Sequence, residues 1–76
     1  MSRYFFHVHG VRGSRDEVGE DLPSDEAAWE EATIISGELF RDIDGKFRPG
    51  QEWTLEVQDH QRNPIYVINI SAKRLK

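Results

Sequence analysis

The chain has no cysteine among its 76 residues, which excludes disulfide bonds and the cysteine-based structural zinc sites. It also has no apolar run near the roughly 20 residues that a membrane-spanning helix needs. At the N-terminus, His7 and His9 interrupt the apolar residues Tyr4-Phe5-Phe6, and this stretch is too short for the core of a secretory signal. We therefore expect a cytoplasmic protein that does not enter a membrane.

The chain is long enough for one domain and no more. A domain of this size buries only about 60–65% of the surface that its unfolded chain exposes, so its stability margin is small. The two Trp, two Tyr and four Phe residues can form a compact core, although 32% of the residues are charged. We expect residues 1–76 to form a single domain, with the basic tail 71–76 as the segment least expected to be ordered. Its small size also favours a homo-oligomer.

The net charge of −4 is distributed unevenly along the chain. The window from Asp16 to Asp44 holds eleven acidic residues and one basic residue, Arg41, a balance of −10. Outside it, nine Lys and Arg residues face three acidic residues, a balance of +6. The chain is thus electrically two-sided, which matters for its partners more than the overall charge does.

The residues before the helix predict one clear strand and one weak strand. In residues 3–9, Tyr4, Phe6 and Val8 alternate with the other side chains, which predicts a half-buried strand. Its second face then carries Arg3, Phe5, His7 and His9. Residues 16–22 are charged and contain Gly19, so we expect at best a short strand at an edge of the sheet.

One long helix is predicted to begin after Ser24, whose side chain can cap the first turn. Trp29 and Phe40 flank an apolar stripe at helical spacing, formed by Ala28, Ala32, Ile35, Leu39 and Ile43. The helix should end between Arg41 and Asp44, where Gly45 can adopt the left-handed cap conformation.

Two further strands are predicted after the helix. Residues 53–58 alternate between apolar and polar side chains, whereas residues 64–70 are apolar on both faces. A strand of the second kind is either central and covered twice, or part of an interface. Two hairpins flanking a helix predict an α+β fold of ββαββ order, with a mainly antiparallel four-stranded sheet and one helix on one face. The first and last strands are the most apolar, so at least one of them should be central.

His7 and His9 lie two residues apart and leave the same face of their strand. Such a pair could bind zinc with His60 or a carboxylate as the third ligand. The alternative is that both histidines are half-exposed residues at ordinary strand positions. We favour the alternative, because two histidines without a defined third ligand are a weak signal. We therefore expect no metal site and no cofactor.

The open face of the sheet is the best candidate for an interaction. Phe5 could stack on a nucleic-acid base there, while Arg3, Arg12, Arg15 and the tail residues Lys73, Arg74 and Lys76 contact phosphates. The negative net charge argues against this alternative. We favour a second subunit, or a small protein partner, packed on that face or on a sheet edge. The predicted interaction residues are Arg3, Phe5, His7, His9, Tyr66 and Ile68.

No residue pattern supports catalysis. The serines lie outside any nucleophile-elbow context, and Glu20 and Asp21 are neighbours in a strand, so their side chains diverge. We therefore predict no catalytic residue and a domain that is not an enzyme.

The N-terminal residues Arg3-Tyr4-Phe5-Phe6-His7-Val8 resemble the opening of a family of small uncharacterised alphaproteobacterial proteins, classed as a domain of unknown function. The resemblance continues through Leu22-Pro23 and the helix entry to residues 53–59. It implies a stand-alone cytoplasmic domain without an assigned activity, ligand or catalytic residue. It also weakens the case for His9 as a metal ligand, because similar proteins are expected to carry other residues there.

Overall fold

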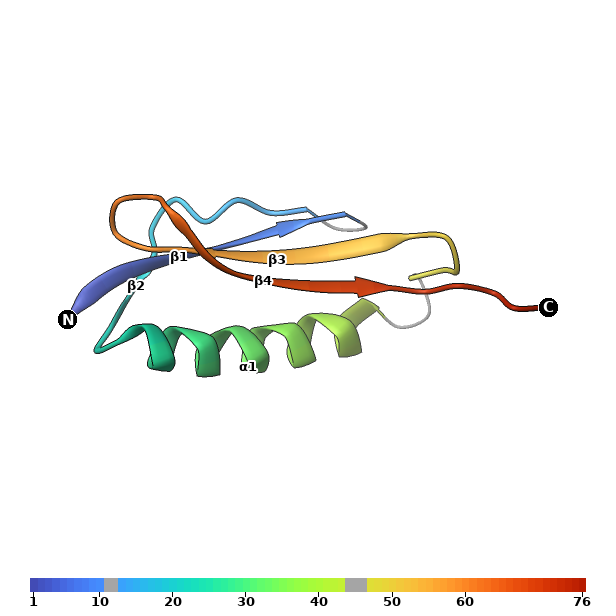
Figure 1. Cartoon of the computed structure of the whole chain (residues 1–76), viewed down its shortest axis with the longest axis horizontal. Coiled ribbons are helices and arrows are strands. Elements are labelled where there is room, and N and C mark those ends of the chain that lie inside the picture. Colours follow the sequence, from blue (N-terminus) through green and yellow to red (C-terminus); the bar gives the residue numbers. More distant parts are fainter. Residues whose placement is uncertain (11–12, 44–46) are drawn as a thin grey trace.

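The computed structural model describes residues 1–10, 13–43 and 47–76, except the side chains of residues 42 and 43. In this part of the chain the elements follow one another as β1 (Ser2–His9), β2 (Glu20–Leu22), α1 (Asp25–Ile43), β3 (Glu52–Gln58) and β4 (Pro64–Ser71). The strands form one antiparallel sheet in the order β2-β1-β3-β4, and α1 lies along one face of it (Figure 1). The predicted α+β fold of ββαββ order is therefore confirmed.

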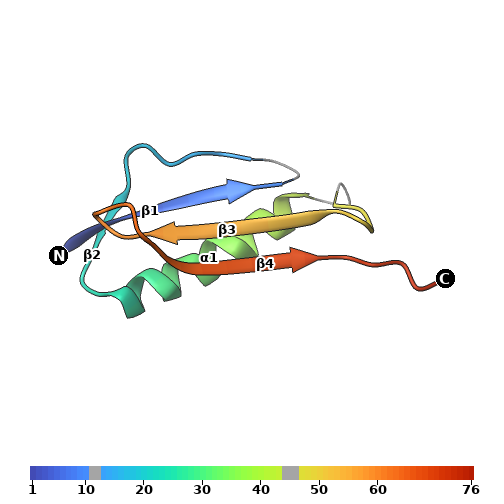
Figure 2. The ribbon, with the colours of Figure 1, turned by 45° about the horizontal axis from the view of Figure 1, so that its top comes forward.

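β1 is central, between β2 and β3, whereas β4 is an edge strand (Figure 2). This confirms that one of the two most apolar strands lies inside the sheet. The side chains of Tyr4, Phe6 and Val8 project towards α1, as their alternation predicted, and join Trp53, Leu55 and Val57 of β3 in the core. Full burial of an aliphatic or aromatic side chain contributes roughly 1.5–3 kcal/mol, so each of these six buried side chains stabilises the fold by about that amount.

α1 begins as the sequence predicts, because the Ser24 Oγ accepts a hydrogen bond of 3.1 Å from the Ala27 N–H. Ala28 and Ala32 are completely buried, and their small side chains allow the helix to lie close to the sheet. The helix ends at Ile43, within the predicted limits, and the predicted cap at Gly45 lies outside the described residues. Among the residues described, no helix is long and apolar enough to cross a membrane.

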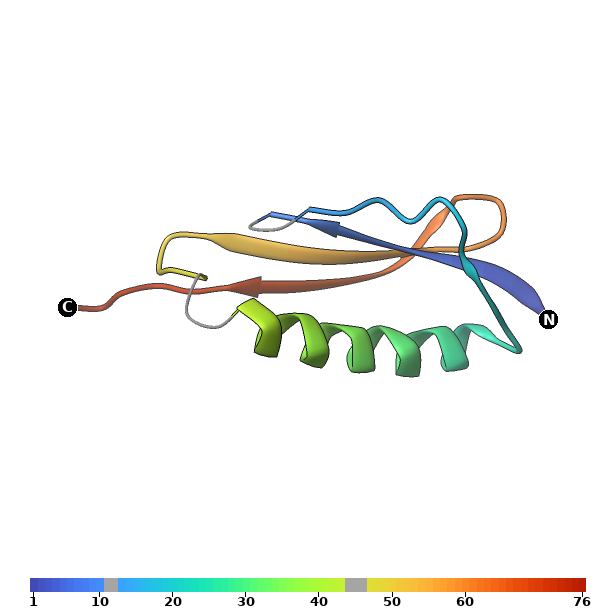
Figure 3. The ribbon, with the colours of Figure 1, turned by 180° about the vertical axis from the view of Figure 1, so that it is seen from behind.

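The predicted weak strand within residues 16–22 is confirmed as a short edge strand, in which only Glu20–Leu22 pair with β1. Residues 13–19 instead follow the outer edge of β1 and lean over the sheet face opposite α1, as opposite views show (Figures 1 and 3). The cause is Asp16, whose carboxylate accepts the N–H groups of Val18 and Gly19 and closes a turn. We call residues 13–19 the covering segment and the sheet face opposite α1 the helix-free face.

Candidate interaction surface

The predicted interaction residues do not form one surface. The side chains of Arg3, Phe5, His7 and His9 belong to the helix-free face, because they alternate with the core residues of β1. Tyr66 and Ile68 are opposite Val57 and Leu55 in the β3–β4 ladder, so they share the face that α1 covers. Tyr66 and Ile68 therefore cannot join Phe5 in one open-face site, which corrects that grouping.

Phe5 is buried although α1 does not cover it. Its exposed fraction is 7%, and the guanidinium carbon of Arg62 lies 3.6 Å from the centre of its ring. This is a cation–π contact made by the β3–β4 turn. The expectation that Phe5 lies on an open surface is wrong, because the chain itself covers the ring.

Gly19 completes the cover on Phe5. Its φ angle of +78° lies in the region that favours glycine. A Cβ atom at this position would also lie only 2.7 Å from the Arg3 Cγ and 2.9 Å from the Phe5 Cε1. Gly19 is therefore required both by its backbone conformation and by the close approach of the covering segment to β1.

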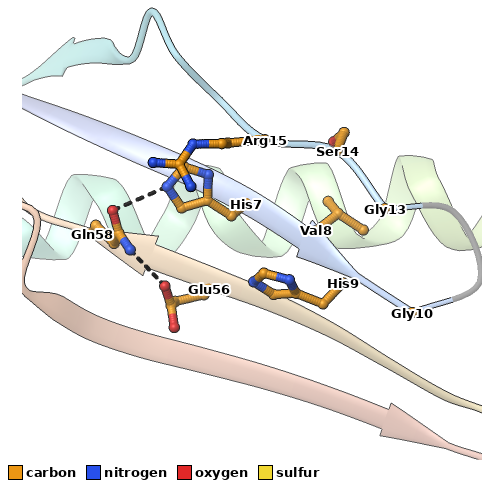
Figure 4. A pocket seen from close by; sticks show the side chains of 9 residues that line it. All are labelled: His7, Val8, His9, Gly10, Gly13, Ser14, Arg15, Glu56 and Gln58. Atoms are coloured by element: carbon orange, nitrogen blue, oxygen red, sulfur yellow. Dashed lines mark hydrogen bonds between the residues drawn. The ribbon is translucent and has the colours of Figure 1, made fainter.

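His7 is 4% exposed, so the expectation of a half-exposed histidine is also wrong. Its Nδ1 accepts a hydrogen bond of 3.0 Å from the Asp16 N–H, which assigns the ring proton to Nε2. The Nε2–H then donates to the Gln58 Oε1 at 3.0 Å, and the Gln58 Nε2 donates to the Glu56 Oε2 at 2.7 Å (Figure 4). Both ring nitrogens of His7 are thus used within the domain.

Asp16 holds the covering segment in place. Besides the two N–H groups of its own turn, its carboxylate accepts the Phe6 N–H of β1 at 3.2 Å. Burial alone raises the pKa of this carboxyl, but the three backbone N–H groups and nearby His7 lower it, and the pKa lies below its ordinary value. Sequence reasoning missed this role, although the Asp-x-x-Gly pattern is typical of a turn closed by an Asp side chain.

His9 lies at the end of β1 and is exposed. With His7 it lines an open pocket of about 520 Å³ between β1, β3 and the covering segment (Figure 4). The remaining lining includes Arg15, Glu56 and Gln58, and the Arg15 Nε is paired with Glu17 at 2.9 Å. Among the described residues, no group of three His, Cys, Asp or Glu side chains could hold a metal ion.

The nucleic-acid alternative requires basic side chains that are free to contact phosphates, and Arg3 and Arg12 are two of the residues it names. The Arg3 Nε is 3.2 Å from an Asp21 carboxylate oxygen, and its guanidinium also donates to the Val18 carbonyl. Arg12 lies outside the described residues. Arg3 therefore contacts the β2 edge of its own domain.

The outer edge of β4 is different, because no described strand pairs with it. Its eight residues carry no charged side chain, and Val67 is 58% exposed. Ala72 exchanges hydrogen bonds with Gly50 and Gln51 on the inner side. Along an antiparallel strand, successive residues turn their N–H and C=O groups alternately towards the partner strand and away from it. Since the groups of Ala72 point inward, those of Val67, Asn69 and Ser71 point outward. We call this row of backbone groups the β4 edge.

Exposed aromatic side chains of α1 lie beside the β4 edge. Trp29 packs on Tyr66 with ring centroids 5.2 Å apart, and it is still 37% exposed. Phe40 is 51% exposed and follows Trp29 at helical spacing, so it lies on the same side of α1. Since α1 approaches β3 more closely than β4, Tyr66 and Ile68 remain partly open, and Trp29 and Tyr66 form a partly exposed apolar contact beside the β4 edge, whereas Phe40 packs on Phe47.

Residues 3–71 match the family model described as a domain of unknown function, DUF6894. No curated protein and no solved structure matches the chain. The match covers the helix and all the strands described above except Ser2 of β1, and it confirms the resemblance to a domain of unknown function. This chain belongs to the DUF6894 family.

Proposed function

We propose that this domain is a cytoplasmic, non-enzymatic interaction module that self-associates through the β4 edge. The observation that carries the proposal is a full-length edge strand without a charged residue. Sheet edges are usually protected from further pairing by charges, bulges, covering loops or very short strands. β4 has a bulge at Ile65 and Pro64 at its first position, but its outward positions Val67, Asn69 and Ser71 are exposed and carry no charge.

The burial of the two most apolar strands supports the same proposal. A strand that is apolar on both faces is central and covered twice, or it belongs to an interface. β1 meets the first condition, because α1 covers one face and the covering segment and Arg62 cover the other. β4 lies at an edge and exposes Val67, so the second condition is the one that fits it. A second copy would also add buried apolar surface to a small domain.

The nucleic-acid alternative has less support. Its stacking residue, Phe5, lies under Arg62, and its phosphate contact, Arg3, is engaged by Asp21. The polar pocket likewise gives little support for catalysis, because His7, Gln58 and Glu56 satisfy one another. Neither surface offers a set of free groups comparable with the β4 edge.

Sedimentation velocity over a range of protein concentrations tests the proposal. The wild type is expected to form a dimer, and Val67→Lys to raise the dissociation constant at least tenfold, which corresponds to about 1.4 kcal/mol. The reason is that a Lys side chain on an edge strand opposes pairing with a second strand, because its charge loses part of its hydration beside the added strand. The matched control is Ile34→Lys, since Ile34 is similarly exposed at 55% but lies on the outer side of α1.

Circular dichroism of both variants confirms that they are folded. A wild type that stays monomeric at about 1 mM, where even a weak complex forms, would contradict self-association. A Val67→Lys variant that dimerises as tightly as Ile34→Lys would place the interface away from the β4 edge.

A further inference from the structure

We infer that the pocket between β1, β3 and the covering segment binds a small zwitterion, a free amino acid whose carboxylate pairs with Arg15 and whose ammonium group pairs with Glu56. The inference goes beyond the proposed function and does not depend on it, because none of the described residues that line the pocket belongs to β4. The pocket volume of about 520 Å³ falls within the range of small-molecule sites.

Two walls of the pocket carry opposite charges. Arg15 belongs to the covering segment and Glu56 to β3, and in the close view His7 lies between them (Figure 4). Among the described residues, Arg15 is paired with Glu17, and no ion pair joins it to Glu56. The pair with Glu17 is weak, because both side chains are at least 70% exposed. The two charges of the pocket walls are therefore not paired with each other.

Walls of opposite charge favour a ligand that carries both charges. A simple anion drawn to Arg15 would also meet the Glu56 carboxylate, and a simple cation drawn to Glu56 would also meet the guanidinium. In each case one attraction is offset by one repulsion. A zwitterion instead gains two attractions at once, so its affinity should exceed that of either single charge.

Both charged groups keep hydrogen-bonding capacity for a ligand. A guanidinium has five N–H donors in a planar fork that matches a carboxylate, and a carboxylate accepts about four hydrogen bonds. In the described part of the chain, Glu17 lies at the Arg15 Nε, and Gln58 donates to the Glu56 Oε2. The terminal nitrogens of Arg15 and the Oε1 of Glu56 remain for the carboxylate and the ammonium group of the ligand.

The backbone beneath Arg15 is fixed from both sides. Ser14 exchanges two backbone hydrogen bonds with Val8, at 2.8 and 2.9 Å, and the Asp16 N–H donates to the His7 Nδ1 at 3.0 Å. Arg15 thus stands between two anchored residues. Because this wall is ordered before a ligand arrives, binding does not require the covering segment to lose further conformational entropy.

A directed chain of hydrogen bonds fixes the opposite wall. The His7 Nε2–H donates to the Gln58 Oε1, and the Gln58 Nε2 donates to Glu56. Both bonds are donated in the direction of Glu56, so the chain ends in an acceptor at the pocket wall. An ammonium group, which has donors and no acceptor, matches this wall, whereas a second carboxylate does not.

A chemical-shift titration of isotope-labelled protein tests the inference. The reporters are the Gln58 side-chain amide on one wall and the Ser14 and Asp16 backbone amides on the other. The probes are glycine, β-alanine and γ-aminobutyrate, which hold the two charges at increasing separations, and the single-charge analogues acetate and ethylammonium. The titrations are made at about pH 7.5, where an ordinary histidine is mainly neutral, so that Arg15 is the cation tested.

We expect at least one of the three zwitterions to bind with a dissociation constant on the order of 1–10 mM, since the ligand is small and the pocket is open. Acetate and ethylammonium are expected to bind at least tenfold more weakly. The inference is overturned by a single-charge analogue that binds as tightly as the best zwitterion. It is also overturned if no zwitterion gives a saturable shift at concentrations up to about 50 mM.

Two charge-neutralising variants show whether the walls act through their charges. Glu56→Gln is expected to weaken zwitterion binding at least tenfold and, because a repulsion is removed, to tighten acetate binding severalfold. Arg15→Gln is expected to weaken zwitterion binding likewise and to tighten the binding of ethylammonium. The matched controls are Glu30→Gln and Arg74→Gln, which make the same charge changes at exposed positions outside the pocket.

Circular dichroism is first used to show that the four variants are folded. Weaker zwitterion binding in Glu56→Gln without tighter acetate binding would mean that Glu56 only shapes the pocket, and it overturns the pairing with the ammonium group. Equal affinities in the pocket variants and the controls place the binding elsewhere and overturn the inference. A wild type that binds the zwitterion but stays monomeric contradicts the proposed function and leaves this inference standing.

Discussion

At the β1 side of the sheet, a three-residue strand and the covering segment close the edge, whereas at the other side β4 is eight residues long and its outer side has no partner strand in the described chain. The first edge carries carboxylates, with Glu20 and Asp21 in β2 and Asp16 bound to β1. The second carries none, and basic residues follow it. Four acidic residues of the window from Asp16 to Asp44 thus lie at the first edge, whereas the basic tail follows the second edge.

This difference shows that an apolar strand can be explained in two ways within one small domain. Phe5 and His7 are buried by local turn chemistry, since Asp16 folds the covering segment over them. Val67, by contrast, is 58% exposed. The helix-free face of β1 is therefore part of the monomer's own core, and the β4 edge is the surface that a partner can still use.

The largest effect is expected from removing the side chain that closes the β1 edge. Asp16→Ala deletes the acceptor of three backbone N–H groups and leaves the Phe6 N–H without its partner. Hydrogen bonds to charged groups contribute about 1.5–3 kcal/mol each but do not add independently, so we expect a loss of about 2–4 kcal/mol. Urea denaturation at one fixed protein concentration measures it, since dimerisation makes stability depend on concentration.

The matched control is Glu17→Ala, the neighbouring acidic residue, whose exposed pair with Arg15 is expected to contribute less than about 0.5 kcal/mol. Similar losses for the two variants would mean that the covering segment adds little to the monomer. The β1 edge would then be as open as the β4 edge, and the comparison between them would fail.

The fold was largely predictable from the sequence, and the surface was not. Alternation in β1 and β3 and the capped helical stripe are local signals, and they identified Tyr4, Phe6 and Val8 as core residues. The burial of Phe5 and His7 depends on a turn closed by Asp16 and on Arg62, which is distant in sequence. The face of β4 that carries Tyr66 was ambiguous because both faces are apolar, and only its register with β3 settles it. The strand order could not be predicted for the same reason, since it depends on which strands pair and not on the apolar pattern within each strand.

A smaller effect is expected from comparing two glycines, one near each edge. Gly19 and Gly50 both have positive φ angles, +78° and +91°. A Cβ at Gly19 would clash with Phe5 and Arg3, whereas at Gly50, which donates to Ala72 beyond β4, it would meet nothing within 4 Å. We expect Gly50→Ala to cost about 1 kcal/mol and Gly19→Ala about 2–3 kcal/mol. Equal losses in urea denaturation would show that the covering segment can move away from β1 at little cost.

The smallest effect is expected from acid, and it should involve the β1 edge rather than β4, which has no acidic or basic side chain. The pKa of Asp16 is lowered in the folded domain, so its contribution is present above the unfolded value of about 3.9 and is lost as the pH falls below it. The Asp16→Asn variant retains an acceptor for the turn but loses the charge. We expect it to be about 1 kcal/mol less stable than the wild type at pH 7, and the difference to shrink below about pH 4. Urea titrations from pH 3 to 7 test this, with Glu17→Gln expected to stay within about 0.5 kcal/mol of the wild type throughout. If the stability difference between Asp16→Asn and the wild type did not change with pH, the negative charge of Asp16 would not be what holds the covering segment on β1.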